Sequence, residues 1–235
     1  MKLYVKKNID KYELLYKSGH DHSYPNLDFV RIVSKFIEKK QNSRFLDYGF
    51  GSGENLIYLS KFKFDLYGLE TSKSAINLVK KKFDKIDKKE FKKNLKLIDI
   101  KSNTLKFPDN YFDVISCISV ISLLENKKNI SYLLNEFHRV LKPGGRMIID
   151  INGPKGDFKT KGKYISDEEY EYKLHGDKKL RIYAPKNKSA FKKILHRFKI
   201  VDMGEVFFQY FDFKNHEFIA CVEKKFFVSK KIKNK

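Results

Sequence analysis

The chain has 235 residues, of which 41% are hydrophobic, and this length allows one substantial core. Its longest strongly apolar run, residues 112–124, is shorter than the roughly 20 residues that a membrane-spanning helix needs. The first ten residues lack the apolar stretch of a signal peptide. We therefore expect one domain with no membrane span, located in the cytoplasm. The cysteines, Cys117 and Cys221, lie in strand-like segments, which predicts two core thiols rather than a disulfide or a metal site.

The formal net charge is +21, which makes nucleic acid or an anionic membrane surface conceivable partners. Only six of the 50 basic residues are arginines, however, and arginine is the residue favoured for phosphate and base recognition. The lysines are spread along the chain rather than gathered in one motif. We expect them mainly to form a solvated surface, so nucleic acid is a possible partner but not the favoured one.

Alternating helices and strands are predicted along the first two thirds of the chain. Apolar residues at three- and four-residue spacings predict an amphipathic helix ahead of the main fold. Near-continuous apolar strands alternating with helices indicate a parallel sheet covered on both faces, hence a doubly wound α/β fold. The predicted helices are 27–39, 56–62, 75–83 and 130–141, and the predicted strands are 44–48, 64–69, 95–100, 113–120 and 146–151.

The last third of the chain is less regular. Residues 152–188 are polar and lack clear periodicity, so they form an insertion, a lid or a small accessory hairpin. A helix is predicted over 190–198, followed by two strands over 200–208 and 217–226.

Glycines at positions 49, 51 and 53 form a tight turn between the first strand and its helix, where open α/β sheets bind ligands. A P-loop would need Lys followed by Ser or Thr after the last glycine, but Glu54 follows Gly53. A dinucleotide would need a glycine where Glu54 stands, and a carboxylate there would repel the pyrophosphate. A sulfonium cofactor without phosphate meets no such conflict, so the turn favours S-adenosylmethionine.

Carboxylates follow the predicted strands at the same edge. Asp47 precedes the glycine turn and adds negative potential near it. Glu70 ends the second strand 21 residues after Gly49, where a carboxylate can accept hydrogen bonds from ribose hydroxyls. Asp99, after the third strand, either faces the adenine amino group or caps a turn. The combined spacing favours a cofactor site over solvated strand ends.

Four segments resemble the class I S-adenosylmethionine-dependent methyltransferase family, in its order and spacing: residues 45–53, 69–72, 107–114 and 137–145. The resemblance implies a Rossmann-like, seven-stranded, mostly parallel sheet with its last strand antiparallel. It also implies that the glycines contact the methionine part of the cofactor, Glu70 the ribose, and Asp99 with Ile100 the adenine. The predicted cofactor-binding residues are Asp47, Gly49, Gly51, Gly53, Asn55, Glu70, Thr71, Asp99, Ile100, Ser116 and Ile118.

The resemblance implies methyl transfer by in-line displacement, and we expect a small-molecule acceptor methylated on oxygen or nitrogen. The segment around Tyr24 and Asn26 is similar to the entry segment of a small-molecule subgroup, and Ser122 stands where many relatives carry histidine. Tyr24, Asn26 and Ser122 are therefore the substrate candidates. No residue pattern fixes a catalytic base. The candidates are His20, His22, His175 and His216, for each of which plain solvent exposure is the simpler interpretation.

Two alternative functions stay open. The net charge would suit a nucleic-acid methyltransferase, although residues 119–122 do not form the Asn-Pro-Pro-Tyr-like motif of base-flipping enzymes. A non-catalytic cofactor-binding protein of the same fold would keep the same glycines.

In domain terms, we expect a helical N-terminal segment (1–40) that caps the site, a methyltransferase domain (41–226) and a basic tail (227–235). No metal is predicted, and the oligomeric state is not predicted.

Overall fold

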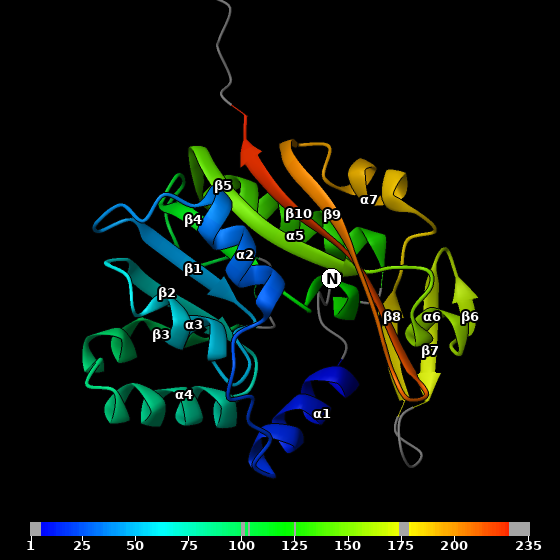
Figure 1. The fold of residues 1–235 in the computed structure, drawn as a ribbon, viewed down its shortest axis with the longest axis horizontal. Helices are drawn as coiled ribbons and strands as arrows, with labels where there is room; N and C mark the ends of the chain where they lie inside the picture. Colours follow the sequence, from blue (N-terminus) through cyan, green and yellow to red (C-terminus); the bar gives the residue numbers. More distant parts are fainter. Residues whose placement is uncertain (1–5, 100–101, 103, 125, 174–178, 226–235) are drawn as a thin grey trace, which may run out of the picture.

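The computed structural model describes residues 6–99, 102, 104–124, 126–173 and 179–225. Its main sheet has seven strands: β1 (Arg44–Tyr48), β2 (Asp65–Glu70), β3 (Leu95–Leu97), β4 (Phe112–Cys117), β5 (Leu141–Asn152), β9 (Phe198–Tyr210) and β10 (Phe213–Lys224). The order across the sheet is β3-β2-β1-β4-β5-β10-β9 (Figure 1). Strands β1 to β5 are parallel, whereas β10 runs antiparallel to both of its neighbours. This confirms the predicted seven-stranded sheet with its last strand antiparallel.

Helices cover both faces of this sheet. One face carries α2 (Leu27–Phe36), α3 (Glu54–Leu59) and α4 (Lys73–Lys85), and the other carries α5 (Lys127–Val140) and α7 (Lys188–Ile194). In Figure 1, α2 crosses in front of the sheet and α5 runs behind it. The helices of the first face bury Phe29, Leu56 and Val79 in one apolar cluster, and those of the second bury Phe137 and Phe191 in another. The two clusters confirm the doubly wound α/β architecture.

Local hydrogen bonds begin the helices that flank the strand ends. The Asn26 side chain accepts a hydrogen bond from the Phe29 amide at 2.9 Å and thereby caps α2. The Ser72 hydroxyl accepts one from the Ala75 amide at 3.0 Å and caps α4. Ser72 directly follows β2, and Asn26 lies in the segment between α1 (Lys6–Lys17) and α2, so both caps fix segments that surround the site.

Several predicted boundaries were wrong: α2 ends at Phe36 rather than 39, β3 ends at Leu97 rather than 100, and β5 begins at Leu141 rather than 146. The strand predicted over 113–120 ends with β4, because Ser119 has a φ of 59°, a left-handed conformation that ends an extended strand. The helix predicted over 190–198 ends with α7, because Phe198 already begins β9 and pairs with β10. Pairing partners distant in the sequence therefore decide where this helix stops.

Residues 152–188 form a short helix and a small separate sheet rather than a single hairpin. The helix is α6 (Asp157–Thr160), and the antiparallel strands are β6 (Lys163–Ser166), β7 (Glu169–Lys173) and β8 (Lys179–Tyr183). Figure 1 shows this sheet beside the β9–β10 hairpin. It is thus an accessory layer attached at the β10 side of the domain.

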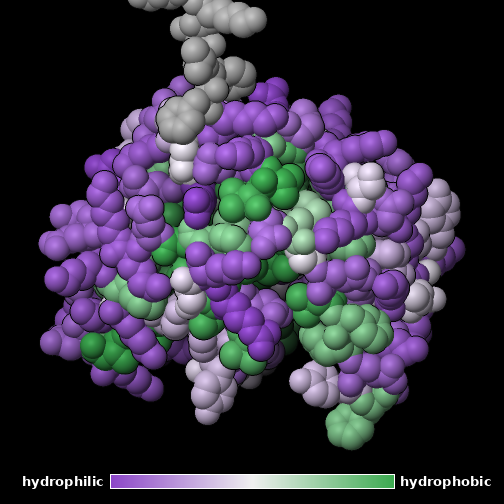
Figure 2. Space-filling view, turned by 45° about the horizontal axis from the view of Figure 1, so that its top comes forward, coloured by the Kyte–Doolittle hydropathy of each residue, from purple (hydrophilic) through white to green (hydrophobic). Residues whose placement is uncertain are grey.

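The face of the molecule shown in Figure 2 is covered mainly by hydrophilic residues, with smaller hydrophobic areas between them. This agrees with lysines that form a solvated surface. Among the helices of the described residues, none combines the length and apolar character needed to cross a membrane. Cys117 and Cys221 are buried free thiols, as expected.

Candidate cofactor site

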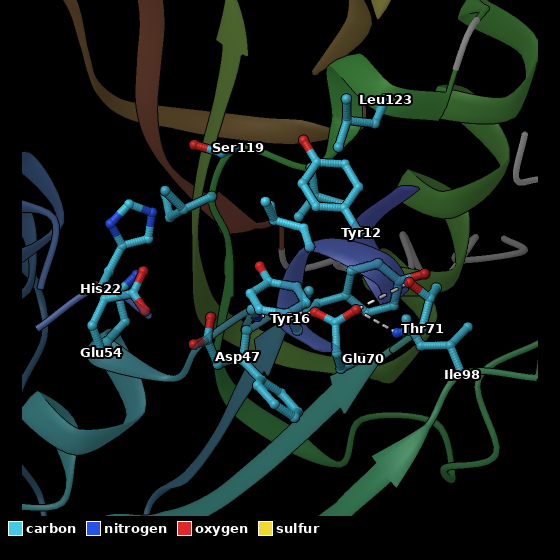
Figure 3. A pocket seen from close by; sticks show the side chains of 18 of the residues that line it. Tyr12, Tyr16, His22, Asp47, Glu54, Glu70, Thr71, Ile98, Ser119 and Leu123 are labelled. Atoms are coloured by element: carbon cyan, nitrogen blue, oxygen red, sulfur yellow. Dashed lines mark hydrogen bonds between the residues drawn. The ribbon is translucent and has the colours of Figure 1, made fainter. Parts of the chain in front are cut away.

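A cavity of about 420 Å³ lies at the carboxyl ends of the central strands, beneath α1 (Lys6–Lys17). Figure 3 shows Asp47 and Glu70 on one side of it, with Tyr12 and Leu123 opposite. The ends of the cavity also differ, because His22 and Glu54 lie at one end while Thr71 and Ile98 lie at the other. The carboxyl edge of a parallel sheet is where open α/β folds bind ligands, so this cavity is the candidate site.

The glycine turn forms a closely fitted wall of the cavity. Gly49 and Gly51 have φ values of 73° and 54°, which glycine adopts without strain. A Cβ atom on Gly49 would lie 2.3 Å from a Val120 methyl, and one on Gly51 would lie 2.6 Å from the Tyr16 hydroxyl. Any larger residue would therefore fill the space in which a ligand could approach the backbone.

Asp47 presents a buried carboxylate to the cavity. It is 2% exposed, and the Ser116 hydroxyl donates to its Oδ1 atom at 2.6 Å. Its Oδ2 atom has no hydrogen-bond partner among the described residues. Burial, with smaller contributions from the nearby Glu54 and Glu70 carboxylates, raises the pKa of Asp47 to about 7 against the lowering effect of the Ser116 hydrogen bond. A buried carboxylate oxygen without a partner fits a cationic ligand such as a sulfonium or an ammonium group.

This shifted pKa makes the stability of the ligand-free protein pH-dependent. Unfolding returns the pKa of Asp47 to its ordinary value of 3.8, so the folded protein keeps a proton that the unfolded chain has lost. Raising the pH from 5 to 7 should therefore lower the unfolding free energy of the wild type by about 2 kcal/mol relative to Asp47→Asn. Urea titrations of both proteins at the two pH values measure this. An equal pH dependence in the two proteins would contradict the buried, protonated carboxyl.

Glu70 is held rigidly at the end of β2. Its Oε2 atom accepts a hydrogen bond from the Gly51 amide at 2.9 Å, and its Oε1 atom accepts from the Thr71 amide at 2.6 Å and the Thr71 hydroxyl at 3.0 Å. A carboxylate offers about four acceptor positions, so Oε2 retains capacity for a ligand hydroxyl. The carboxylate is thus held in a fixed orientation, with one oxygen able to accept a further hydrogen bond.

Most of the predicted site residues meet at this cavity. The predicted residues that line it are His20, His22, Tyr24, Asn26, Asp47, Gly49, Gly51, Asn55, Glu70, Thr71 and Ile118. Tyr24 is 83% exposed, so it lies at the rim. The Asn55 side-chain oxygen accepts from the Asn26 amide at 3.1 Å, which joins the entry segment to α3.

Two predicted contacts lie just outside the lining. Gly53 has a φ of 80°, and a Cβ atom there would meet the Val79 side chain at 2.4 Å, so this glycine lets α3 pack against α4. Ser116 is fully buried below the cavity and acts through its hydrogen bond to Asp47. Both residues shape the site from behind.

Asp99 lies in a smaller adjoining cavity of about 90 Å³, which shares Ile98 with the larger one. Its Oδ1 atom accepts from the Ser102 amide at 3.3 Å, and its Oδ2 atom lies 3.3 Å from the Lys106 ammonium. Asp99 thus caps a turn beside the Ile98 end of the main cavity, and its contact with the adenine stays a prediction. Ile100 lies outside the described residues.

The structure places Ser122 and His216 away from the cavity. Ser122 lies in the short helix η2 (Ile121–Leu124) and is 4% exposed; its hydroxyl accepts from the Asn152 amide at 2.9 Å, which ties η2 to β5. His216 is 1% exposed; its Nδ1 atom accepts from the Lys155 amide at 3.0 Å, and its Nε2 atom donates to Glu205 at 2.8 Å. Both ring nitrogens are occupied, so His216 cannot serve as a base for a ligand in this cavity. His175 lies outside the described residues.

The roof that α1 forms was not located from the sequence. Tyr12 and Tyr16 project into the cavity, and the Asn8 side chain donates to the carbonyls of Leu123 and Arg181 at 3.0 and 3.2 Å. Glu13 accepts hydrogen bonds from the hydroxyls of Ser72 and Ser74 at the start of α4, at 2.6 and 2.7 Å.

The sequence carries a signal for this helix, because Ile9, Tyr12 and Tyr16 recur at three- and four-residue spacings. What the spacing cannot show is that this apolar face covers a cavity rather than joining the core.

Comparisons with known proteins agree with this geometry. Residues 46–149, from β1 into β5, match a family model described as a methyltransferase domain. The ubiquinone/menaquinone biosynthesis C-methyltransferase UbiE of Hahella chejuensis is 38% identical over 56 residues, which cover 24% of this chain and 21% of that relative. The matched segment thus spans about a fifth of the length of that curated relative.

Solved structures are similar over nearly the whole chain. A SAM-dependent methyltransferase from Methanosarcina mazei has a TM-score of 0.66 at 19% identity, covering 88% of this chain and 99% of its own. The 1,6-didemethyltoxoflavin-N1-methyltransferase of Burkholderia thailandensis, solved with 1,6-didemethyltoxoflavin and S-adenosylhomocysteine, has a TM-score of 0.62 at 12% identity, covering 94% and 88%. At these identities the likeness establishes the fold. Residues 46–149 are thus similar to a methyltransferase domain, and the fold of the chain is that of the S-adenosylmethionine-dependent methyltransferases that it resembles.

Proposed function

We propose that this protein transfers the methyl group of S-adenosylmethionine to a small-molecule acceptor, on oxygen or nitrogen, inside the cavity beneath α1. The observation that carries this proposal is the chemical character of the lining. Three carboxylates, Asp47, Glu54 and Glu70, line the cavity, whereas no lysine or arginine does so among the described residues. A protein of net charge +21 thus keeps its cations away from this site.

The residues present fit the cofactor. Glu70 would bind the ribose hydroxyls, the backbone of the glycine turn would hold the methionine part, and Asp47 would face the positive end. When bound, the cofactor supplies an activated methyl group and a neutral thioether leaving group. The chain itself must then mainly orient the acceptor and exclude water, an effect that can contribute roughly 7 to 11 kcal/mol.

The roof of the cavity favours an acceptor with a large apolar surface. Leu15, Val120, Leu123 and Leu124 line it together with the ring of Tyr12. Polar groups are few on this side, as in sites for small apolar ligands. The Burkholderia neighbour is named for methylation of a small molecule, which supports the same class of acceptor here.

Residues 1–40 are proposed to cap the site. Their described part contributes α1, whose side chains are hydrogen-bonded to α4, η2 and β8, and the segment 20–26 at the rim. Such a cap would have to open for ligands to enter. It would also exclude water during transfer.

A nucleic-acid acceptor is less compatible with the site. Phosphate groups are bound by lysine and arginine, and an acidic cavity would repel them. The lysines of the surface could still attract RNA without leading to methylation. Following the transferred methyl group into small molecules or RNA therefore distinguishes the two classes of acceptor.

The test supplies S-adenosylmethionine labelled in its methyl group, together with a small-molecule extract and total RNA in parallel reactions. We expect label in the small-molecule fraction with wild type and Glu90→Ala, an exposed control, and none with Glu70→Ala. Salt-sensitive labelling of RNA would instead establish the nucleic-acid alternative. Cofactor binding without label in either fraction would point to the non-catalytic alternative.

A further inference from the structure

His20 and His22 form a pair at one end of the cavity. Their Nε2 atoms are 3.0 Å apart, and the two rings meet edge to face with centroids 4.5 Å apart. An N–H···N hydrogen bond needs one donor and one acceptor, so the neutral pair shares one proton between these atoms. The pair can take up one further proton on a free Nδ1 atom and keep this hydrogen bond.

The pair is fixed against the glycine turn. The His22 amide donates to the Ser52 hydroxyl at 3.1 Å, and Ser52 lies between the glycines of the turn. The Lys82 ammonium donates to the Ser52 carbonyl at 2.9 Å and forms an ion pair with Asp21, which lies between the two histidines. The backbone that carries the two imidazoles is thus held against the glycine turn, which would hold the methionine part of the cofactor.

The direction of the cofactor follows from the two ends of the cavity. Glu70 is placed for the ribose, and Ile98 lies beyond it next to Asp99, where the adenine is expected. The methionine part must then extend the opposite way, toward Glu54 and His22 (Figure 3). That part carries a positive sulfonium, a positive ammonium and a negative α-carboxylate.

The α-carboxylate lacks an obvious partner in an acidic cavity. The carboxylates of Asp47 and Glu54 suit the two positive groups, but they repel a negative one. Among the described lining residues, the two imidazoles are the side chains that can become cationic near neutral pH. Only proton uptake by this pair would supply the missing positive charge.

The surroundings favour the neutral form of His20 before a ligand binds. Burial lowers the pKa of His20, and the neighbouring His22 lowers it further, while Glu54 and Asp21 act in the opposite direction. The ring of Tyr16, from α1, lies 6.0 Å from His20 and adds no charge. Lys82, from α4, is neutralised by Asp21. A carboxylate beside the pair would favour its protonated form.

We propose that the His20–His22 pair binds the α-carboxylate at the methionine end of the cofactor and takes up a proton as it does so. The inference rests on the proposed cofactor site and adds a pH-dependent subsite to it. Because the pair takes up a proton on binding, the affinity of the wild type relative to a variant without the pair should rise as the pH falls, by at most about tenfold per unit. Ligands that lack the α-carboxylate should not show this pH dependence of binding.

The test compares S-adenosylhomocysteine with 5′-methylthioadenosine, a probe that keeps the nucleoside thioether but lacks the amino-acid part. Calorimetry is performed with wild type, with His20→Asn/His22→Asn and with His196→Asn, an exposed control. We expect the double variant to bind S-adenosylhomocysteine about ten to a hundred times more weakly, as for a lost charge-assisted hydrogen bond, and methylthioadenosine almost unchanged. In buffers of different ionisation enthalpy, wild type should take up more protons than the double variant.

Equal weakening of both ligands in the double variant would overturn the inference, because it would indicate a merely structural role. Unchanged binding of S-adenosylhomocysteine, or equal proton uptake in the two proteins, would overturn it too. If wild type bound neither ligand, the proposed cofactor site itself would fail. The two failures are therefore distinguishable within one experiment.

Discussion

Replacing Glu70 by alanine is expected to weaken binding of S-adenosylmethionine by about 100-fold or more. The variant loses the carboxylate that we propose accepts a hydrogen bond from the ribose, and a hydrogen bond to a charged group contributes roughly 1.5–3 kcal/mol. It also releases the Gly51 amide, which donates to Glu70 at 2.9 Å, so the glycine turn becomes less well held. Isothermal titration of the purified variant measures the change.

Glu90→Ala is the matched control, because Glu90 is an exposed carboxylate in the short helix η1 (Lys89–Asn94). We expect its affinity to equal that of the wild type. Glu70→Gln, which keeps an oxygen acceptor without the charge, should fall between the two. An affinity of Glu70→Ala within threefold of wild type would show that Glu70 does not contact the cofactor.

Gly53→Ala should lower the unfolding free energy by about 2–4 kcal/mol. Part of this cost is the φ of 80°, which disfavours any residue with a Cβ atom. The remainder is the overlap with Val79, whose buried methyl would lie 2.4 Å from the new carbon. Urea unfolding of the ligand-free protein measures the difference.

Gly19→Ala separates the two contributions. Gly19 also has a positive φ, 92°, but a Cβ atom there meets nothing within 4 Å. This variant should therefore show only the conformational part, about 1–2 kcal/mol. Equal losses in the two variants would show that packing of α3 against α4 is not what requires glycine at position 53.

The sequence predicted the floor of the cavity well because its determinants are local. A tight turn requires Gly49 and Gly51 whatever surrounds it, and Glu70 follows at a spacing fixed by one helix and one strand. Near-continuous apolar strands likewise determine a sheet with two covered faces. These features need only short-range periodicity and the geometry of the parallel sheet.

The roof could not be predicted in the same way. Tyr12 and Tyr16 have the spacing of a helical face, but only the fold shows that this face lies over Gly51. The role of each histidine was equally unpredictable, because no sequence pattern distinguishes one candidate histidine from another. Pairing of β9 with β10 places His216 against Glu205, and a contact with the glycine turn places His20 and His22 beside the cavity. Chemistry that depends on distant partners appears only in three dimensions.

Titration of the wild-type protein with S-adenosylmethionine, with NAD as the competing cofactor, tests the central claim most directly. We expect one molecule of S-adenosylmethionine to bind per chain at micromolar concentration, and NAD not to bind. The reasons are the acidic lining of the cavity, which includes Glu54, and the Glu70 carboxylate that can accept a hydrogen bond from a ligand. Binding of NAD, or the absence of any heat with S-adenosylmethionine, would contradict the assignment of this cavity as the cofactor site.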